Sequence, residues 1–276
     1  MKYLKLSAYL IAIIFITIAC VKEEKEKDFD PNTLKDNAIA ENIFSDVFQQ
    51  SGKASRDADD ETSQKTDIEI LSNCPSLTIT PFDTTWPKTL VLDYGSTNCT
   101  GTDLRQRRGK VNIVATERWR EAGSITTITF DNYFIDNHKV EGTKIITNLG
   151  RNQNNNLVYD VKVQNAVVTK PDNTTIQWGS VRSHEWIEGE STILNPFDDV
   201  YLISGNVTGT SAAGVNYTID TQQPLNVKFG CRWVREGVIE INIQNLQTIT
   251  LDYGDGTCNP NATATYLGVS YPILLQ

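Results

Sequence analysis

The chain has 276 residues, with 25 Lys and Arg against 34 Asp and Glu, and so carries a formal net charge of -9. An acidic chain lacks the electrostatic attraction on which nucleic-acid binding and adhesion to anionic membrane surfaces depend, so we exclude nucleic acid as a partner. The strongest basic run, Arg105, Arg107, Arg108 and Lys110, is too short to reverse that balance.

The N-terminal leader, residues 1–19, has the pattern of a bacterial export signal. Lys2 and Lys5 form its positive start, Leu6 to Ile18 is apolar, and a small residue directly precedes Cys20. So short an apolar run spans a bilayer poorly, which predicts a cleaved signal peptide rather than a permanent membrane helix. The run resembles a lipobox, in which the signal is cut before a lipidated cysteine, although Thr17 stands where Leu is usual. We therefore expect Cys20 to carry lipid; the alternative is a plain secretory signal.

Residues 20–31 form a charged tether, because no apolar side chain follows Val21 up to Asp28. The segment resembles the acidic stretch directly after the lipidated cysteine of surface-exported lipoproteins of the Bacteroidota. That resemblance implies an outer-membrane lipoprotein, exposed at the cell surface and held to the membrane through its N-terminal lipid. The alternative is a hydrophilic tether without an export role.

The next segment is predicted to be an amphipathic helix over residues 32–50, the single clear helix of the chain. Apolar residues recur there at helical spacing: Leu34, Ile39, Ile43, Phe44, Val47 and Phe48. Residues 51–65 are rich in Gly, Ser, Asp, Glu and Lys, which predicts a flexible linker.

From residue 66 to the C-terminus, apolar and polar residues alternate with a period of two, as in Leu157 to Gln164. Turn-forming pairs such as Asp172-Asn173 and Glu236-Gly237 separate the runs. Short turns between consecutive strands favour antiparallel neighbours. We therefore predict an all-β domain over 66–276, an antiparallel meander that forms a sandwich or an open barrel.

A duplicated unit marks the two ends of this β domain, at 74–114 and 231–273. Leu92-Asp93-Tyr94-Gly95 recurs as Leu251-Asp252-Tyr253-Gly254, at an offset of 159 residues. In each copy a cysteine follows the glycine by four places and another lies upstream. Because Asp beside Gly at a strand end is ordinary turn chemistry, we interpret both Asp residues as turn formers rather than catalytic acids.

Four cysteines remain once Cys20 is assigned to lipid: Cys74, Cys99, Cys231 and Cys258. An even number in an exported chain predicts disulfides, and four cysteines allow three pairings. Pairing within each unit, Cys74 with Cys99 and Cys231 with Cys258, is the only choice that closes both copies in the same way.

The chain also resembles a family of uncharacterised Bacteroidota lipoproteins with an Asp-aromatic-Gly and an Arg-Lys-Gly-Lys pattern. The residues that carry the resemblance are Leu-Asp-Tyr-Gly with its Cys, Asp103, Arg105, Arg108-Gly109-Lys110-Val111, Val140 to Thr143, Trp178, Arg182 and Trp186, with Arg107-Arg108-Gly109-Lys110 in place of the second pattern. No activity is assigned to that family, so the resemblance supports compartment and fold only.

The sequence contains few residues that could form a catalytic, metal or cofactor site. The two histidines, His138 and His184, lie far apart in sequence, and no Cys/His spacing suggests a metal or a redox centre. The Asp252 to Gly256 loop lacks the ligand spacing of a calcium loop. We therefore predict no catalytic residue, no metal and no cofactor; a hydrolase that uses carboxylates is the least favoured alternative.

The strongest candidate for ligand binding is a stripe on one predicted strand. If Thr175 to Ile187 is extended, then Trp178, Arg182, His184 and Trp186 share one face. Two indoles that flank Arg and His are suited to stacking a sugar or binding a carboxylate. The alternative interpretation is that these amphipathic side chains pack in a partly buried face.

Asp83-Thr84-Thr85 resembles the acceptor pattern of Bacteroidota O-glycosylation, which makes Thr84 a candidate modification site. Together these features predict a lipid-anchored envelope protein that acts as a non-enzymatic structural or binding module. The main alternative is a surface lipoprotein that binds a glycan or another small ligand, with a glycan or an envelope protein as its partner.

Overall fold

The computed structural model describes residues 31–59, 74–192, 195–244 and 246–275. The predicted signal peptide, Cys20, the charged tether up to residue 30, residues 60–65 of the predicted linker and residues 66–73 of the predicted β domain lie outside these ranges. The helix is α1 (Asn32–Asp59), and a short 3₁₀ turn, η2, spans Pro196–Asp198. The strands are β1 (Ser76–Thr80), β2 (Lys88–Asp93), β3 (Cys99–Thr100), β4 (Gln106–Ala115), β5 (Ile125–Ile135), β6 (His138–Arg151), β7 (Leu157–Thr169), β8 (Thr175–Glu188), β9 (Val200–Thr210), β10 (Asn216–Lys228), β11 (Glu236–Ile243), β12 (Ile249–Asp255), β13 (Asn261–Tyr266) and β14 (Val269–Leu274).

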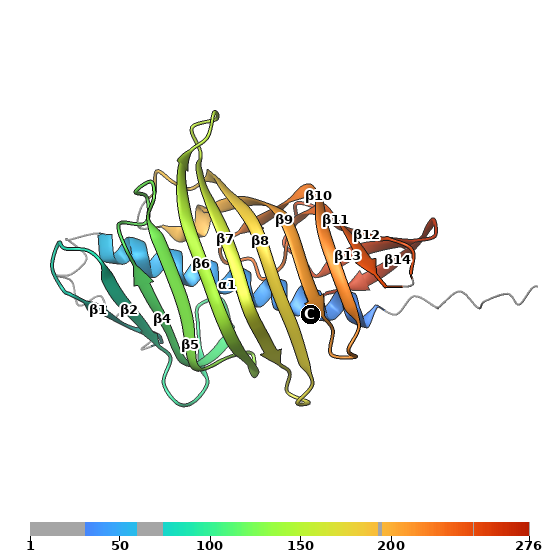
Figure 1. The fold of residues 1–276 in the computed structure, drawn as a ribbon, viewed down its shortest axis with the longest axis horizontal. Coiled ribbons are helices and arrows are strands. Elements are labelled where there is room, and N and C mark those ends of the chain that lie inside the picture. Colours follow the sequence, from blue (N-terminus) through green and yellow to red (C-terminus); the bar gives the residue numbers. More distant parts are fainter. Residues whose placement is uncertain (1–30, 60–73, 193–194, 245, 276) are drawn as a thin grey trace, which may run out of the picture.

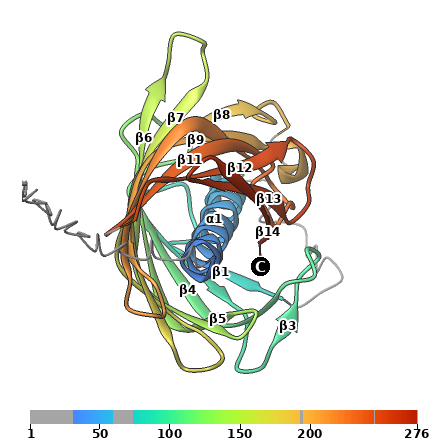
Figure 2. The same ribbon diagram turned by 90° about the vertical axis from the view of Figure 1, so that its right-hand side faces the viewer.

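All strands belong to one antiparallel sheet whose order follows the sequence from β1 to β14, except that β3 pairs with β4 beside the main path. The prediction of an all-β antiparallel meander is confirmed. Of the two forms considered, a sandwich and an open barrel, the structure has the single open sheet, which curls around α1 (Figure 2). The helix covers the concave face that a second sheet would cover in a sandwich.

The axis of the helix runs across the strands, along the long dimension of the concave face of the sheet (Figure 1). The predicted apolar stripe is buried, from Leu34 at 0 % exposed to Ile39 at 6 %. Polar residues of α1 are buried as well, among them Asp36, Glu41 and Asp46. A helix that is enclosed on most of its circumference must find partners for such groups inside the protein.

The helix continues to Asp59, nine residues beyond the predicted boundary, so the prediction of a linker is wrong for residues 51–59. Small side chains in this last part allow close packing: a Cβ at Gly52 would lie 3.1 Å from the Trp119 ring. The Ser51 hydroxyl donates to the Phe48 carbonyl at 3.1 Å. Tertiary packing thus outweighs the weak helix propensity of Gly and Ser.

The two sequence units lie at opposite edges of the sheet, with β1 to β4 in the first unit and β11 to β14 in the second. Both predicted disulfides are confirmed: Cys74–Cys99 closes the β1–β2 pair and Cys231–Cys258 closes the β11–β12 pair. We call these two ends the disulfide corners.

The local turn is the same in both corners. Asp93 Oδ1 accepts from the Gly95 N–H and Asp252 Oδ1 from the Gly254 N–H, each at 2.8 Å. The units diverge afterwards, because Asp93 pairs with Lys110 whereas Asp252 pairs with Thr263, six residues nearer along the chain. The pairing before the turn differs as well, because Asp93 pairs with Ser76 whereas Asp252 pairs with Val238. The structural likeness is therefore the Asp-Tyr-Gly turn and the disulfide of each unit.

Among the residues that the structure describes, no helix is long and apolar enough to cross a membrane.

Candidate functional site

The predicted binding stripe on β8 lies beneath α1. Trp178, Arg182, His184 and Trp186 do share one face, and each is at most 4 % exposed. Trp178 donates from Nε1 to Asn37 Oδ1 at 3.0 Å and stacks on Phe44, with ring centroids 5.3 Å apart. These four side chains form the surface on which the helix packs, so in this structure the stripe is not open to a ligand.

Ion pairs join the helix to the concave face along its length. From the N-terminal end they are Asp36–Lys170 at 3.0 Å, Glu41–Arg182 at 2.7 Å, Asp46–Arg107 at 2.5 Å and Arg56–Asp199 at 2.8 Å. Asp46 also lies 4.0 Å from Arg105. Each of these charged side chains of α1 meets its opposite charge at only one position of the helix on the sheet. If the helix moved along the sheet by one turn, buried charges would lose their partners.

Burial governs the protonation of several groups in this interface. It lowers the pKa of Lys144 to about 7, and the Nζ of Lys144 donates to the Phe44 carbonyl at 2.6 Å. Burial, together with the nearby charges of Lys144 and Arg182, holds the pKa of His184 well below its ordinary value. His184 is therefore a neutral imidazole packed 4.4 Å from the Phe48 ring, and it contributes no charge.

The C-terminal end of α1 sits in an aromatic cluster. The Arg56 and Arg120 guanidinium groups each lie 5.1 Å from the Trp186 ring centroid. Burial raises the pKa of Asp199 to about 6 even though Arg56 opposes the shift. The desolvation of the carboxyl outweighs its ion pair, which marks this pair as costly to bury.

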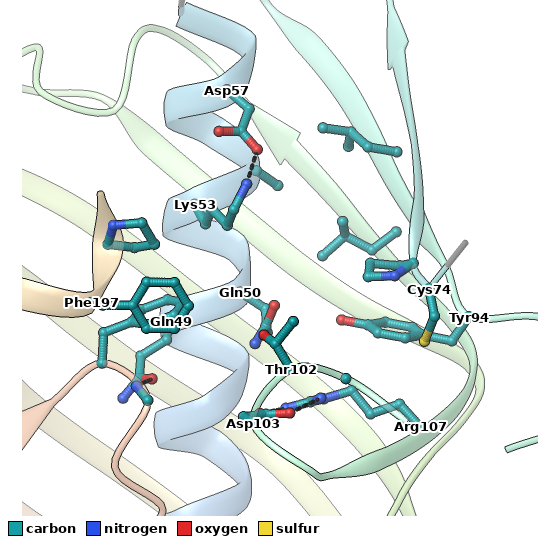
Figure 3. A pocket seen from close by; sticks show the side chains of 18 residues that line it. Gln49, Gln50, Lys53, Asp57, Cys74, Tyr94, Thr102, Asp103, Arg107 and Phe197 are labelled. Carbon is teal, nitrogen blue, oxygen red and sulfur yellow. Dashed lines mark hydrogen bonds and ion pairs between the residues drawn. The ribbon is translucent and has the colours of Figure 1, made fainter. Parts of the chain in front are cut away.

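One side of α1 is not covered by the sheet, and there an open cavity of about 210 Å³ lies between the first disulfide corner and the β8–β9 and β10–β11 connections (Figure 3). The helix forms its floor with Gln49, Gln50, Lys53 and Asp57. We call the cavity and its continuation the inter-corner groove.

One wall of the groove comes from the first disulfide corner. It includes Cys74, Leu77, Leu92 and Tyr94, together with the Gly101–Asp103 turn and Arg107. The turn is held closed because the Gly101 N–H donates to the Arg105 carbonyl at 2.9 Å. Asp103 accepts from Arg107 across the turn, at 3.0 and 2.5 Å.

The opposite wall comes from distant residues, Pro196, Phe197, Phe229 and Gly230. The Phe197 ring packs edge-on against Phe229, with centroids 5.4 Å apart, and is still 53 % exposed. Asn195 caps η2 by accepting from the Phe197 N–H at 3.2 Å, which holds this turn in place. At Gly230, φ is +81° and a Cβ would lie 3.3 Å from Phe197, so glycine suits both backbone and contact.

The groove continues beside the second corner as a narrower cavity of about 20 Å³. It shares Gln49, Asp103 and Gly230 with the larger cavity and is also lined by Cys231 and Arg232. Arg232 pairs with Asp136 at 3.2 Å, and so does Arg105 at 3.1 Å. One cysteine of each disulfide corner thus borders the groove.

Tyr94 is the buried polar group that faces this groove. Its side chain is directed from the strand wall toward α1 (Figure 3), and it is 4 % exposed. Its hydroxyl has no hydrogen-bond partner within the described part of the chain. Burial raises the pKa of Tyr94 well above its ordinary value, so the hydroxyl keeps its proton. Less than 1 Å² of its oxygen is accessible, so the hydroxyl lies behind the surface of the cavity wall, and a ligand in the cavity does not reach it.

The ionic side chains of the larger cavity are already neutralised. Lys53 pairs with Asp57 at 2.5 Å, and Arg107 pairs with both Asp103 and the buried Asp46. Although burial acts in the opposite direction in each case, Asp46 and Asp103 raise the pKa of Arg107, and Arg107 lowers that of Asp103. Neither acid of this cavity therefore stands apart from a base.

The other sequence candidates lie elsewhere. Thr84 is exposed in the β1–β2 connection, where Asp83 accepts from the Thr85 N–H at 2.8 Å and leaves the Thr84 side chain outside that bond. Within the described ranges, no group of three or more His, Cys, Asp or Glu side chains is placed to hold a metal ion. His138 is the first residue of β6, directly after the β5–β6 turn, with Nδ1 3.0 Å from the Asp136 carbonyl.

Sequence reasoning missed the groove because its walls come from residues more than 120 positions apart, such as Asp103 and Phe229. The one available signal was the pairing of the duplicated units, which indicated that the two ends of the domain are alike but not that a cysteine of each borders one groove beside α1.

No protein-family model, no curated protein and no solved structure gives a significant match to this chain.

Proposed function

We propose that this protein is a lipid-anchored protein of the bacterial cell envelope, exposed at the outer-membrane surface, and that it is a non-enzymatic binding module. The support for anchorage is the leader that ends at Cys20 and the charged tether behind it. Two disulfides are compatible with an exported protein, since oxidising compartments preserve them.

A binding role is preferred over catalysis because of what the groove holds. General acid–base work needs a carboxyl whose proton can move at working pH. Asp57 and Asp103 are each paired with a neighbouring cation, and the pKa of Asp103 is lowered rather than raised. The single observation that carries the proposal is an open cavity of about 210 Å³ beside the first disulfide corner, with the half-exposed Phe197 ring on its wall.

A rigid scaffold suits such a role. The helix α1 fills the concave face of the sheet, and buried ion pairs join the two. These contacts hold the walls of the groove in a fixed arrangement, as a preformed binding site requires. A purely structural module would need the same scaffold, and the groove is the feature that favours binding.

The anchor is tested with the full chain, expressed with its own leader in a bacterium that processes lipoproteins. Mass spectrometry of the mature N-terminal peptide is expected to show Cys20 as the first residue, with acyl chains attached. Protease added to intact cells is expected to digest the protein. The Cys20→Ala variant, as control, is expected to stay unprocessed. A mature chain that begins elsewhere, or an unmodified Cys20, would contradict the proposal.

A further inference from the structure

We propose that the inter-corner groove binds one neutral sugar ring of a glycan, with Phe197 as the stacking surface and the Gln50 amide as a hydrogen-bonding group. This inference rests on the proposed function, because it names the ligand class of the same groove. It replaces the Trp178 to Trp186 stripe, which the helix covers.

The size of the cavity limits the ligand. At about 210 Å³ it is smaller than the roughly 300–1,000 Å³ of pockets that enclose drug-sized molecules. One saccharide ring, with the rest of the glycan outside, fits such a space. A long apolar chain does not, because Lys53, Asp57 and Asp103 interrupt the lining.

An exposed aromatic face is the second requirement of sugar binding. Phe197 is 53 % exposed, although large apolar side chains are usually better covered. Its edge-on contact with Phe229 and the cap from Asn195 hold it in one orientation. The negative face of an aromatic ring attracts the C–H groups that line one side of a pyranose.

Polar groups on the other sides of the cavity suit hydroxyls. Gln49 and Gln50 present amides from the helix, and Thr102 presents a hydroxyl from the turn opposite (Figure 3). Amides and hydroxyls both donate and accept, as sugar hydroxyls do.

The charge balance selects a neutral ligand. Both cations of the larger cavity, Lys53 and Arg107, have carboxylate partners at 2.5 Å. A uronic acid or a sulfated sugar would have to break one of these pairs, which leaves a carboxylate unpaired near the new anion. Neutral hexoses and N-acetylhexosamines can bind without breaking either ion pair.

A glycan array tests the inference with the mature lipidated protein in detergent. Four chains are compared: wild type, Phe197→Ala, Gln50→Ala and, as a matched control, Phe82→Ala. Phe82 is 62 % exposed and does not line the groove. Gln50 belongs to the floor of the cavity and not to the buried core, so Gln50→Ala retains the fold. Thermal melting of each variant checks this.

We expect wild type to retain neutral glycans. Losing the stacking surface in Phe197→Ala should weaken binding about tenfold, and losing one hydrogen-bonding amide in Gln50→Ala about fivefold. Phe82→Ala should bind as wild type does. No retained glycan, retention of anionic glycans only, or equal binding by Phe197→Ala would overturn the inference.

The array and the anchor experiment fail independently. A lipidated, surface-exposed protein that binds no glycan removes the sugar and leaves the anchored module. A protein that binds neutral glycans in detergent but carries no lipid on Cys20 removes the anchor and leaves the site.

Discussion

The ion pairs on the two sides of α1 differ in their exposure to solvent. On the side that faces the sheet, Glu41 and Arg182 form an ion pair with side chains 8 % and 2 % exposed. On the side that faces the groove, Lys53 and Asp57 form a pair that is 46 % and 32 % exposed. Both are short contacts, yet their energetic consequences differ, because water screens the second pair and not the first. The sheet side therefore positions the helix, and the groove side is able to accept a ligand.

The largest effect is expected from breaking the buried pair. In Glu41→Ala the Arg182 guanidinium, whose Nε and Nη1 already lack partners among the described residues, loses its bond to Glu41. An unpaired buried charge costs about 3–5 kcal/mol, measured as the free energy of unfolding in urea. Lys53→Ala, the matched change on the groove side, should cost less than about 1 kcal/mol.

A double variant sharpens this comparison. Glu41→Met with Arg182→Met removes both charges, so most of the lost stability should return, since apolar replacements of a buried pair are often neutral. Equal losses for Glu41→Ala and Lys53→Ala would show that the two sides of the helix do not differ as described.

The second largest loss of stability is expected when the covalent bond of a disulfide corner is removed. The two bridges close segments of 25 and 27 residues. Loops of this length predict about 3.5 kcal/mol each from restriction of the unfolded chain. The Cys74→Ser/Cys99→Ser and Cys231→Ser/Cys258→Ser variants should therefore lose similar stability in urea denaturation. A loss below about 1 kcal/mol for either pair would contradict this.

The smallest effect on stability is expected for Lys144, on the sheet side of α1. Burial lowers the pKa of this lysine to about 7. The unfolded chain keeps a lysine pKa near 10.4. Between these values the unfolded state binds the proton more tightly, so stability rises with pH, by at most about 1.4 kcal/mol per unit, and is level below pH 7. Unfolding free energies of wild type and Lys144→Met at pH 7, 8 and 9 measure this. A difference between the two proteins that does not change with pH would refute the expectation.

The fold was largely predictable from local pattern. Alternation over Leu157 to Gln164 corresponds to β7, and the turn pair Asp172-Asn173 separates β7 from β8. Alternation follows from the pleat, in which neighbouring side chains point to opposite faces. The pattern did not predict the end of α1, because Gly52 and Ser55 are weak helix formers that become suitable only against Trp119 and the sheet.

The candidate site was predicted only in part. Period two correctly placed Trp178, Arg182, His184 and Trp186 on one face, but no local pattern states what covers that face. In this protein α1 covers it, since its acids meet the cations of the concave sheet. Phe197 carried no signal at all, because an exposed ring in a turn has no periodicity.

The sequence by itself determined the strand order, the turns and the pairing of the four cysteines, since each depends on neighbours along the chain or on the duplicated units. The tertiary structure alone decided which face is filled by the helix and where the two disulfide corners leave a groove. The curl of the sheet brings together Tyr94 and Phe197, and that curl is a sum over all the strands rather than a property of any one segment.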